Sequence, residues 1–263
     1  MDFGIKGKHA LVCAASRGLG FAIAKALAEE GVNLIISARD SEKLNQAAET
    51  IRELAKVKVD CIAGDLSIAA DRQKLIDFTK EKAAGVDILV HNVGGPKAQA
   101  AQSTSSADWQ EAFDKLFLPI VELNQTFLPG MKEKKWGRII TVTSLSVIEP
   151  IANLALSNGI RSAVTAMLKT LSDEVAAEGV TVNCLAPGLI QTARTDELME
   201  SRRQLTGQSK EDYMTDYVAS IPARRLGDAD EFGAVAAFLA STRAQYVTGQ
   251  TICIDGGKRR SVH

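Results

Sequence analysis

The sequence predicts a doubly wound α/β fold, in which a seven-stranded, mainly parallel sheet carries helices on both faces. Seven short apolar runs alternate with segments whose apolar residues recur at helical spacing along the 263-residue chain. Strands that are covered on both faces become apolar throughout, because neither face meets water. Sheets of this kind bind ligands at the edge formed by the carboxyl ends of their strands.

The expected strands are short runs rich in Val, Ile and Leu. They cover residues 9–15, 32–37, 57–63, 86–92, 137–144, 180–186 and 250–255. Between them lie helical patterns, of which the most regular cover residues 21–31, 41–55 and 230–241. Because strand and helix alternate so often, the crossovers are expected to be right-handed and to return to one parallel sheet.

The chain is expected to form one domain over residues 1–263. It contains no linker rich in Pro, Gly or Ser and no long internal repeat. Its least regular stretch, residues 191–225, is polar and mixed in charge and precedes the last helix. Long loops inside compact domains commonly cover binding sites, so we expect a substrate lid here, with a simply solvated insertion as the alternative.

Charge and composition narrow the choice of partners. The chain has 31 Lys and Arg against 32 Asp and Glu, a net charge of -1, and no apolar segment approaching a membrane span. We therefore expect no nucleic-acid or membrane partner and a cytoplasmic protein. The four cysteines lie in or beside apolar runs without the spacing of metal ligands, which predicts reduced, packed thiols and no metal site.

A turn of small residues follows the first expected strand. It reads Cys13-Ala14-Ala15-Ser16-Arg17-Gly18-Leu19-Gly20 and runs directly into a helix. Small residues let the backbone approach a pyrophosphate, and the amino end of a helix attracts its negative charge. A tight strand-to-helix turn also favours glycine, so a purely structural role is the alternative at this point.

This turn resembles the Thr-Gly-x-x-x-Gly-x-Gly fingerprint of the short-chain dehydrogenase/reductase family, with Ala14 in place of the first glycine. Four further motifs match in the family's order: Gly64-Asp65-Leu66, His91-Asn92-Val93-Gly94, Pro187-Gly188-Leu189-Ile190-Gln191-Thr192, and Tyr246-Val247-Thr248-Gly249-Gln250 with Asp255-Gly256-Gly257. The resemblance implies a Rossmann fold and a dinucleotide site. The cofactor-binding residues that it implies, together with Arg39, are Ala14, Ser16, Arg17, Gly18, Leu19, Gly20, Asp65, Leu66, Asn92, Val93, Gly94, Pro187, Gly188, Leu189, Ile190 and Thr192.

Charge at the end of the second expected strand favours NADP(H) over NAD(H). That end reads Ser37-Ala38-Arg39, without the acid that would accept ribose hydroxyls, and Arg17 lies in the glycine-rich turn. Two guanidinium groups suit a 2′-phosphate. The alternative is that Arg39 pairs locally with Asp40 or Glu42 and that NAD binds. A methyl group at position 14 is expected to cost about 1 kcal/mol, or roughly tenfold in affinity.

The family's catalytic residues are a Ser, a Tyr-x-x-x-Lys pair and an Asn, and most of them are replaced here. Ser144 matches the family's serine. Counting forward from Ser144 and back from Lys169 places Ser157 at the tyrosine position and Arg161 at the lysine position. Leu116 stands where the family has its asparagine. We therefore take Ser144, Ser157 and Arg161 as the candidate catalytic residues.

These replacements leave the chemistry open. Serine is much less acidic than a phenol and its side chain is shorter, so Ser157 is expected to be a poor proton donor. The motifs most resemble 3-oxoacyl-[acyl-carrier-protein] reductases, in a divergent subgroup with Ser-Asn-x-x-Arg, which implies reduction of a carbonyl such as a 3-oxoacyl thioester. The alternatives are a nucleotide-binding protein without dehydrogenase activity and altered, non-redox chemistry.

Other proton carriers are conceivable in this sequence. Tyr213 and Tyr217 lie four residues apart on the expected lid, and a relay through Ser144, Ser157 and a water molecule is another route. His91 follows the fourth expected strand, where a histidine is more often a structural hydrogen-bond donor than a proton carrier.

The resemblance also implies a homodimer or homotetramer formed through two long helices and the last strand. Apolar residues that would supply such faces, or would equally pack on their own sheet, are Phe113, Phe117, Val121, Val164 and Leu168.

Overall fold

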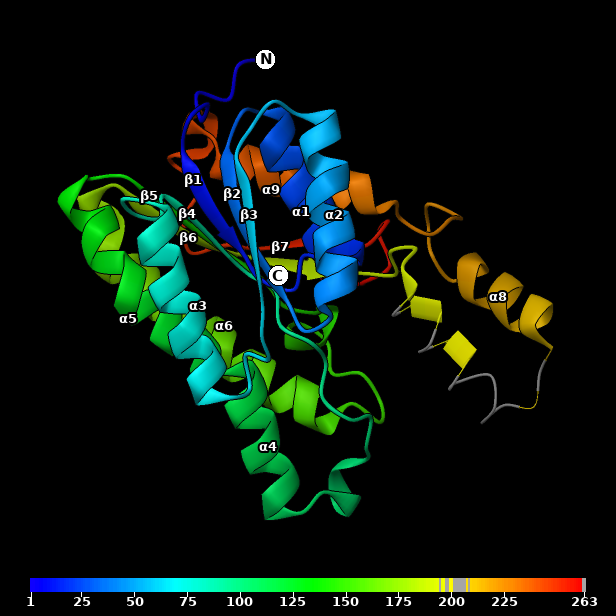
Figure 1. Ribbon diagram of the computed structural model, residues 1–263. Coiled ribbons are helices and arrows are strands. Elements are labelled where there is room, and N and C mark those ends of the chain that lie inside the picture. The colour runs from blue at the N-terminus through cyan, green and yellow to red at the C-terminus, as the bar shows by residue number, and fades with distance from the viewer. Residues whose placement is uncertain (194, 197–198, 201–206, 208, 262–263) are drawn as a thin grey trace.

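The computed structural model describes residues 1–193, 195–196, 199–200, 207 and 209–261. Within these residues a seven-stranded sheet has the order β3-β2-β1-β4-β5-β6-β7, and every neighbouring pair is parallel (Figure 1). The strands are β1 (His9–Val12), β2 (Asn33–Ala38), β3 (Val59–Ala63), β4 (Ile88–His91), β5 (Gly137–Val142), β6 (Val180–Pro187) and β7 (Thr251–Ile254). The predicted doubly wound fold is confirmed.

Helices cover both faces of the sheet and enclose two apolar cores. One core lies under α1 (Gly18–Glu29), α2 (Ser41–Leu54) and α9 (Ala229–Ala240). The other lies under α3 (Ala69–Lys82), α5 (Leu118–Glu133) and α6 (Ala155–Val175), on the opposite side in Figure 1. A smaller cluster joins α4 (Ser106–Leu116) to the start of α6. Segment 191–225 contains α8 (Lys210–Ala219), which stands away from the sheet in Figure 1.

The first strand ends earlier than the apolar run that predicts it. Residues 9–15 read as a strand, but β1 stops at Val12. Cys13 N still donates to Val90 O at 3.1 Å and Ala15 N to Ser37 O at 3.0 Å. Ala14, between them, has a φ of 49°, which breaks the extended conformation. The hydrophobicity of Cys13 to Ala15 thus reflects burial of a turn rather than a longer strand.

The strand order places two segments that are distant in sequence side by side. The chain leaves β1 for β2 and β3 and then returns to β4, which pairs with β1 on its other side. At this switch point Asn92 Nδ2 donates to Ala14 O at 3.3 Å. A Cβ on Gly20 would lie 2.2 Å from the same carbonyl oxygen, so only glycine fits there. The turn after β1 is therefore fixed to the turn after β4.

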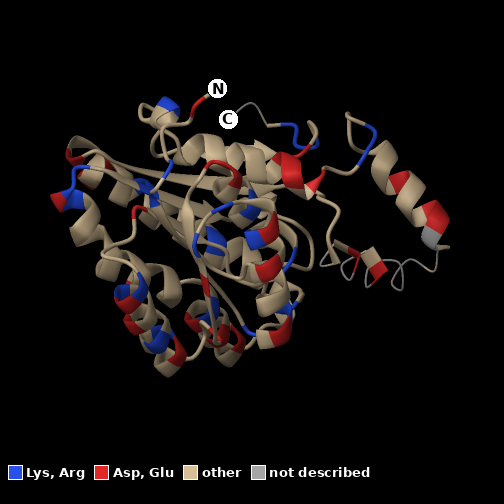
Figure 2. Ribbon diagram, turned by 45° about the horizontal axis from the view of Figure 1, so that its top comes forward, with Lys and Arg blue, Asp and Glu red and all other residues tan. Residues whose placement is uncertain are grey.

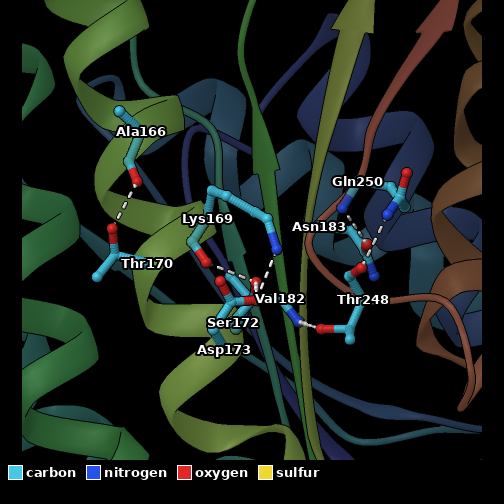
Figure 3. Close-up of polar contacts among 9 residues, drawn as sticks. All are labelled: Ala166, Lys169, Thr170, Ser172, Asp173, Val182, Asn183, Thr248 and Gln250. Atoms are coloured by element: carbon cyan, nitrogen blue, oxygen red, sulfur yellow. Dashed lines mark hydrogen bonds and ion pairs between the residues drawn. The ribbon is translucent and has the colours of Figure 1, made fainter.

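The loop before β7 is hydrogen-bonded to β6, as Figure 3 shows, and packs against α6. Val182 N donates to Thr248 Oγ1 at 3.0 Å, and Gln250 N donates to Asn183 Oδ1 at 3.1 Å. Gly249 has a φ of 69°, and a Cβ there would lie 2.7 Å from Ser172 Oγ. These contacts set the position of β7 and of the segment that follows it.

The described residues contain no helix that combines the length and apolar character needed to cross a bilayer. Cys13 and Cys184 are buried, and burial raises the pKa of each thiol to about 12.

Val164 and Leu168 pack in the core under α6, so they do not supply an outer face. Phe113 and Phe117 are partly buried and stack with ring centroids 4.8 Å apart.

Candidate active site

A cavity of about 1080 Å³ follows the carboxyl edge of the sheet and extends under segment 191–225. It gathers all the sequence-predicted site residues except Gly20. Those that line it are Ala14, Ser16, Arg17, Gly18, Leu19, Arg39, Asp65, Leu66, Asn92, Val93, Gly94, Ser144, Ser157, Arg161, Pro187, Gly188, Leu189, Ile190 and Thr192. Gly20 lies just behind this wall, packed against the Ala14 carbonyl.

The glycine-rich turn leaves room for a ligand to lie directly against the protein backbone. Gly18 has a φ of 60°, and a Cβ there would touch only the Thr192 side chain, at 3.6 Å. Gly94, across the cavity at the end of β4, has open space where a Cβ would stand. Ala14 breaks this pattern, because its methyl group is carried on a positive φ of 49°. The turn keeps its shape at the cost of local strain.

Asp65 and Leu66 line the end of the cavity beyond β3. The Asp65 carboxylate accepts hydrogen bonds from Ser67 N at 2.9 Å and Ser67 Oγ at 2.8 Å. Partial burial acts to raise the pKa of Asp65, but the Ser67 hydrogen bonds and the nearby charges of Arg39 and Lys115 bring it below its ordinary value. The aspartate is therefore a fixed anion in this part of the wall.

Cations collect where β2 ends. Arg39 is exposed at the rim of the cavity, with Nη1 4.0 Å from the Asp65 carboxylate. Lys43, one turn into α2, also lines the cavity and pairs with Asp40 at 2.5 Å. Sequence reasoning missed Lys43, although helical spacing after Asp40 would have placed it beside Arg39. Arg17 from the glycine-rich turn lines the same cavity, and so does Lys115, whose charge acts on Asp65.

An ion pair between a buried arginine and a partly exposed glutamate supports Leu66 from behind. The Arg72 side chain is 4% exposed and binds both carboxylate oxygens of Glu122, at 2.6 and 2.8 Å. Its Nη1 also donates to Leu66 O at 2.8 Å. The Arg72 hydrogen bonds hold the pKa of Glu122 below its usual value, against the opposing effect of burial. The pair joins α3 to α5 and fixes the backbone at the cavity wall.

Ser144 lies two residues after β5 and Ser157 lies in the first turn of α6, and both line the same cavity. Ser144 Oγ accepts a hydrogen bond from Ser146 N at 3.1 Å, which starts a short 3₁₀ turn. Because that bond uses an oxygen lone pair, the hydroxyl proton of Ser144 stays available to a ligand. Ser157 is 7% exposed, so its hydroxyl meets the cavity from a mostly buried position.

Arg161 turns its guanidinium group toward the ends of two strands. Nη1 donates to Val142 O at 3.0 Å, and Nη2 donates to Val93 O at 3.3 Å and Gly94 O at 3.2 Å. The residue is 8% exposed. A single arginine thus holds together the carboxyl ends of β4 and β5, which a lysine, with a compact point charge, cannot do with the same geometry.

The neighbours of Arg161 on α6 also have structural roles. Asn158 Nδ2 donates to Ile151 O at 3.0 Å, which attaches the loop after β5 to the helix. A Cβ on Gly159 would lie 2.7 Å from the Trp109 ring, so glycine allows α4 to pack on α6. The segment Ser157 to Arg161 is therefore well packed despite its departure from the family's pattern.

His91 does not line the cavity. Its ring is 1% exposed, and Nε2 lies 2.8 Å from Asn124 Oδ1. Burial lowers the pKa of His91 to about 4, and the Asn124 hydrogen bond offsets this only in part. The neutral imidazole acts as a structural donor, which was the favoured interpretation of its place at a strand end.

The lid side of the cavity adds two residues of interest. Tyr213 and Tyr217 both lie on α8, with ring centroids 6.1 Å apart, but only Tyr217 lines the cavity. Lys258, which follows the Asp255-Gly256-Gly257 turn, lines the cavity as well. Its Nζ donates to Ser220 Oγ at 2.6 Å and lies 5.6 Å from the centroid of the Tyr217 ring. Lys258, which lies beyond the last family motif, was not singled out from the sequence.

Comparison with known proteins identifies the family. A family model described as enoyl-(acyl carrier protein) reductase matches residues 13–259. The chain belongs to the short-chain dehydrogenase/reductase family. It is 32% identical to the NADPH-dependent reductase BacG of Bacillus subtilis over 97% of this chain and 99% of that protein. It is 34% identical to the 3-oxoacyl-[acyl-carrier-protein] reductase FabG of Vibrio cholerae over 96% and 98%.

A solved structure of a reductase has the same fold. The L-sorbose reductase of Gluconobacter frateurii, in complex with NADPH and L-sorbose, superimposes with a TM-score of 0.93 at 29% identity. The match covers the whole of both chains. The relatives are oxidoreductases, so the family membership also gives the general class of reaction.

Proposed function

We propose that this chain is an NADP(H)-dependent oxidoreductase that reduces the carbonyl group of a small substrate, such as a 3-oxoacyl thioester. The observation that carries the proposal is the continuity of the cavity, which runs from the cations at the end of β2 to Ser144, just after β5. Segment 191–225 is proposed to cover the substrate end of this cavity.

The residues at the nucleotide end fit NADP(H). Arg17, Arg39 and Lys43 would hold the 2′-phosphate, since guanidinium and ammonium groups bind phosphate oxygens. The open space beside Gly18 and Gly94 fits a ligand that approaches the backbone closely. Two relatives are described as using or binding NADPH, which supports the same choice. When bound, the coenzyme supplies the hydride.

The chain's own residues orient the carbonyl and supply a proton. Ser144 would donate its free hydroxyl proton as a hydrogen bond to the carbonyl oxygen. The proton that completes the alcohol would come through Ser157 and water or from Tyr217, which both line the cavity. Arg161 adds a positive charge beneath this region while its guanidinium remains bound to strand carbonyls.

Coenzyme binding is the first test, made by titrating NADPH and NADH while recording their fluorescence. We expect tighter binding of NADPH, and we expect Arg39→Ala to remove most of the difference. Ketone reduction is then compared between the native chain and Ser157→Tyr. A large gain in rate would show that the proton donor limits turnover, whereas equal rates would show that another donor operates. No binding of either coenzyme would contradict the proposal.

The engagement of Arg161 favours a second candidate, a nucleotide-binding protein without dehydrogenase activity. Its guanidinium is bound to the carbonyls of Val93, Gly94 and Val142, and so serves the packing of the fold. NADPH binding without oxidation in the presence of acetoacetyl thioesters and a broad set of ketones would support this candidate. Consumption of a carbonyl substrate without NADPH oxidation would instead indicate non-redox chemistry.

A further inference from the structure

We propose that Lys258 binds a carboxylate of the substrate, so that the preferred substrates are oxo acids. This inference rests on the proposed function and names the class of substrate for the same cavity. The residue lies on the segment after β7, outside the motifs that mark the nucleotide site.

The contacts of the segment after β7 place Lys258 at the substrate end. Gly188 N donates to Ile254 O at 2.9 Å, and a Cβ on Gly188 would lie 2.6 Å from Asp255 Cα. This segment therefore lies directly against the start of 187–192. Lys258 itself contacts Ser220 and Tyr217 at α8, whereas Arg39 and Asp65 mark the opposite end of the cavity.

Hydrogen bonding leaves Lys258 with capacity for one further acceptor. The ammonium group has three protons, and Ser220 accepts two of them, through Oγ at 2.6 Å and O at 3.3 Å. Both partners are neutral. Among the described residues no carboxylate lies within ion-pair distance of Lys258, so its charge is unbalanced.

The three acidic residues that line the cavity, among the described residues, lie beside basic residues other than Lys258. Asp40 binds Lys43 at 2.5 Å, Asp65 lies 4.0 Å from Arg39, and Asp230 binds Lys25 at 2.7 Å. Figure 2 shows basic residues in blue on the described part of the tail near the C-terminus. Among the described residues that line the lid side of the cavity, Lys258 is the one charged group, and its positive charge attracts an anion.

A carboxylate suits this position better than a phosphate. Phosphate sites use several converging donors, whereas Lys258 offers a single remaining proton beside the face of the Tyr217 ring. The remaining ammonium proton of Lys258, beside the Tyr217 ring, fits a ligand that carries a single negative charge on an otherwise apolar chain. Ile151, Leu154, Met199 and Ile221 supply apolar surface in the same cavity.

The experiment compares straight-chain oxo acids of increasing length with their methyl esters, recording NADPH oxidation by the native enzyme. We expect the acids to have the higher kcat/KM at one chain length. Lys258→Met keeps the length of the side chain and removes its charge, so it should lower the acid-to-ester ratio by about ten- to a hundredfold. Added inorganic phosphate should compete weakly, while strong competition would point to a phosphate site.

Two variants serve as controls. Arg260→Met makes the same change of charge on the exposed part of the tail and should keep the native ratio. Ser220→Ala removes the Oγ hydrogen bond but keeps the backbone acceptor and the ammonium group, and should also keep the acid preference. An equal effect of Lys258→Met and Arg260→Met, or native activity that does not favour acids, would overturn the proposal.

A binding measurement separates this inference from the proposed function. If no carbonyl compound is reduced, the proposed function fails, and calorimetry then compares hexanoate with hexanamide on the NADPH-loaded protein. Binding of hexanoate that Lys258→Met abolishes would uphold the carboxylate site alone. Equal binding of acid and amide, or no binding of either, would reject the site.

Discussion

Ala14 is a single residue at which backbone conformation and cofactor binding are in conflict. Its φ of 49° lies in the left-handed region, where a Cβ costs about 1 kcal/mol, and its methyl group lines the cavity. We expect Ala14→Gly to tighten NADPH binding by up to about tenfold. The gain in stability should be smaller, because glycine also gains entropy in the unfolded chain.

Lys135 provides a matched control for this change. It has the same φ of 49° but is exposed and remote from the cavity. Lys135→Gly should therefore relieve comparable strain while leaving the dissociation constant for NADPH, measured by fluorescence titration, at its native value. If both variants changed affinity alike, the effect of Ala14→Gly would not be local.

Arg161 is expected to be essential for stability whatever its part in catalysis. Arg161→Lys removes a fork that binds three backbone carbonyls and replaces it with a point donor. Loss of buried bonds to a charged group should lower the free energy of unfolding by about 2–3 kcal/mol. Urea denaturation measures this free energy. The control is Arg39→Lys at an exposed position, whose stability is expected to lie within about 0.5 kcal/mol of the native value. A neutral Arg161→Lys would contradict this role.

At the scale of the elements, the Arg72–Glu122 pair joins α3 to α5. Glu122→Gln should destabilise the fold by about 1–2 kcal/mol. That is less than for a fully buried pair, because the Glu122 side chain is 38% exposed. Since Arg72 also holds Leu66 O, the variant should bind NADPH more weakly. Unchanged stability and affinity would show that the helices pack without the pair.

The same pair predicts a pH dependence. Arg72 lowers the pKa of Glu122 in the folded protein below its ordinary value of 4.5, so the unfolded chain binds more protons between those two pKa values. The stabilisation is therefore fully present above pH 4.5 and is lost as the pH falls through the lowered pKa. Urea midpoints measured across this range should fall less steeply in Glu122→Gln than in the native protein.

Helix α8 offers a paired test of its two tyrosines. Tyr217 lines the cavity and Tyr213 does not, although they lie on one face of the same helix. If the Tyr217 phenol supplies the proton, Tyr217→Phe should lower kcat by about a hundredfold or more, while Tyr213→Phe should not. Native rates in both variants would assign the proton to the route through Ser157 and water.

For the whole molecule, coenzyme binding should appear as thermal stability. A coenzyme at a hundred times its dissociation constant adds about 2.7 kcal/mol, which raises the melting temperature by roughly 5–10 °C for a chain of this size. We expect NADPH to give this shift at concentrations where NADH gives much less. Equal shifts at equal concentrations would mean that Arg17 and Arg39 do not select the phosphate.

The alternation of strands and helices was enough to predict the sheet, its parallel pairing and the edge that carries the cavity. The motifs predicted most of the cavity wall because each follows a strand. Lys43 and Lys258 were missed because they reach the cavity from a helix turn and a tail. The bonds of Arg161 were also beyond prediction, since they depend on where the ends of β4 and β5 lie in space.

The bonds of Arg161 to two strand ends mean that position 161 cannot be exchanged on its own terms. Installing the family's lysine by itself gives up the guanidinium bonds before any proton donor is gained. A tyrosine introduced at position 157 would instead enter the cavity that Ser157 lines, so the two positions of the family's motif carry separate structural consequences in this chain.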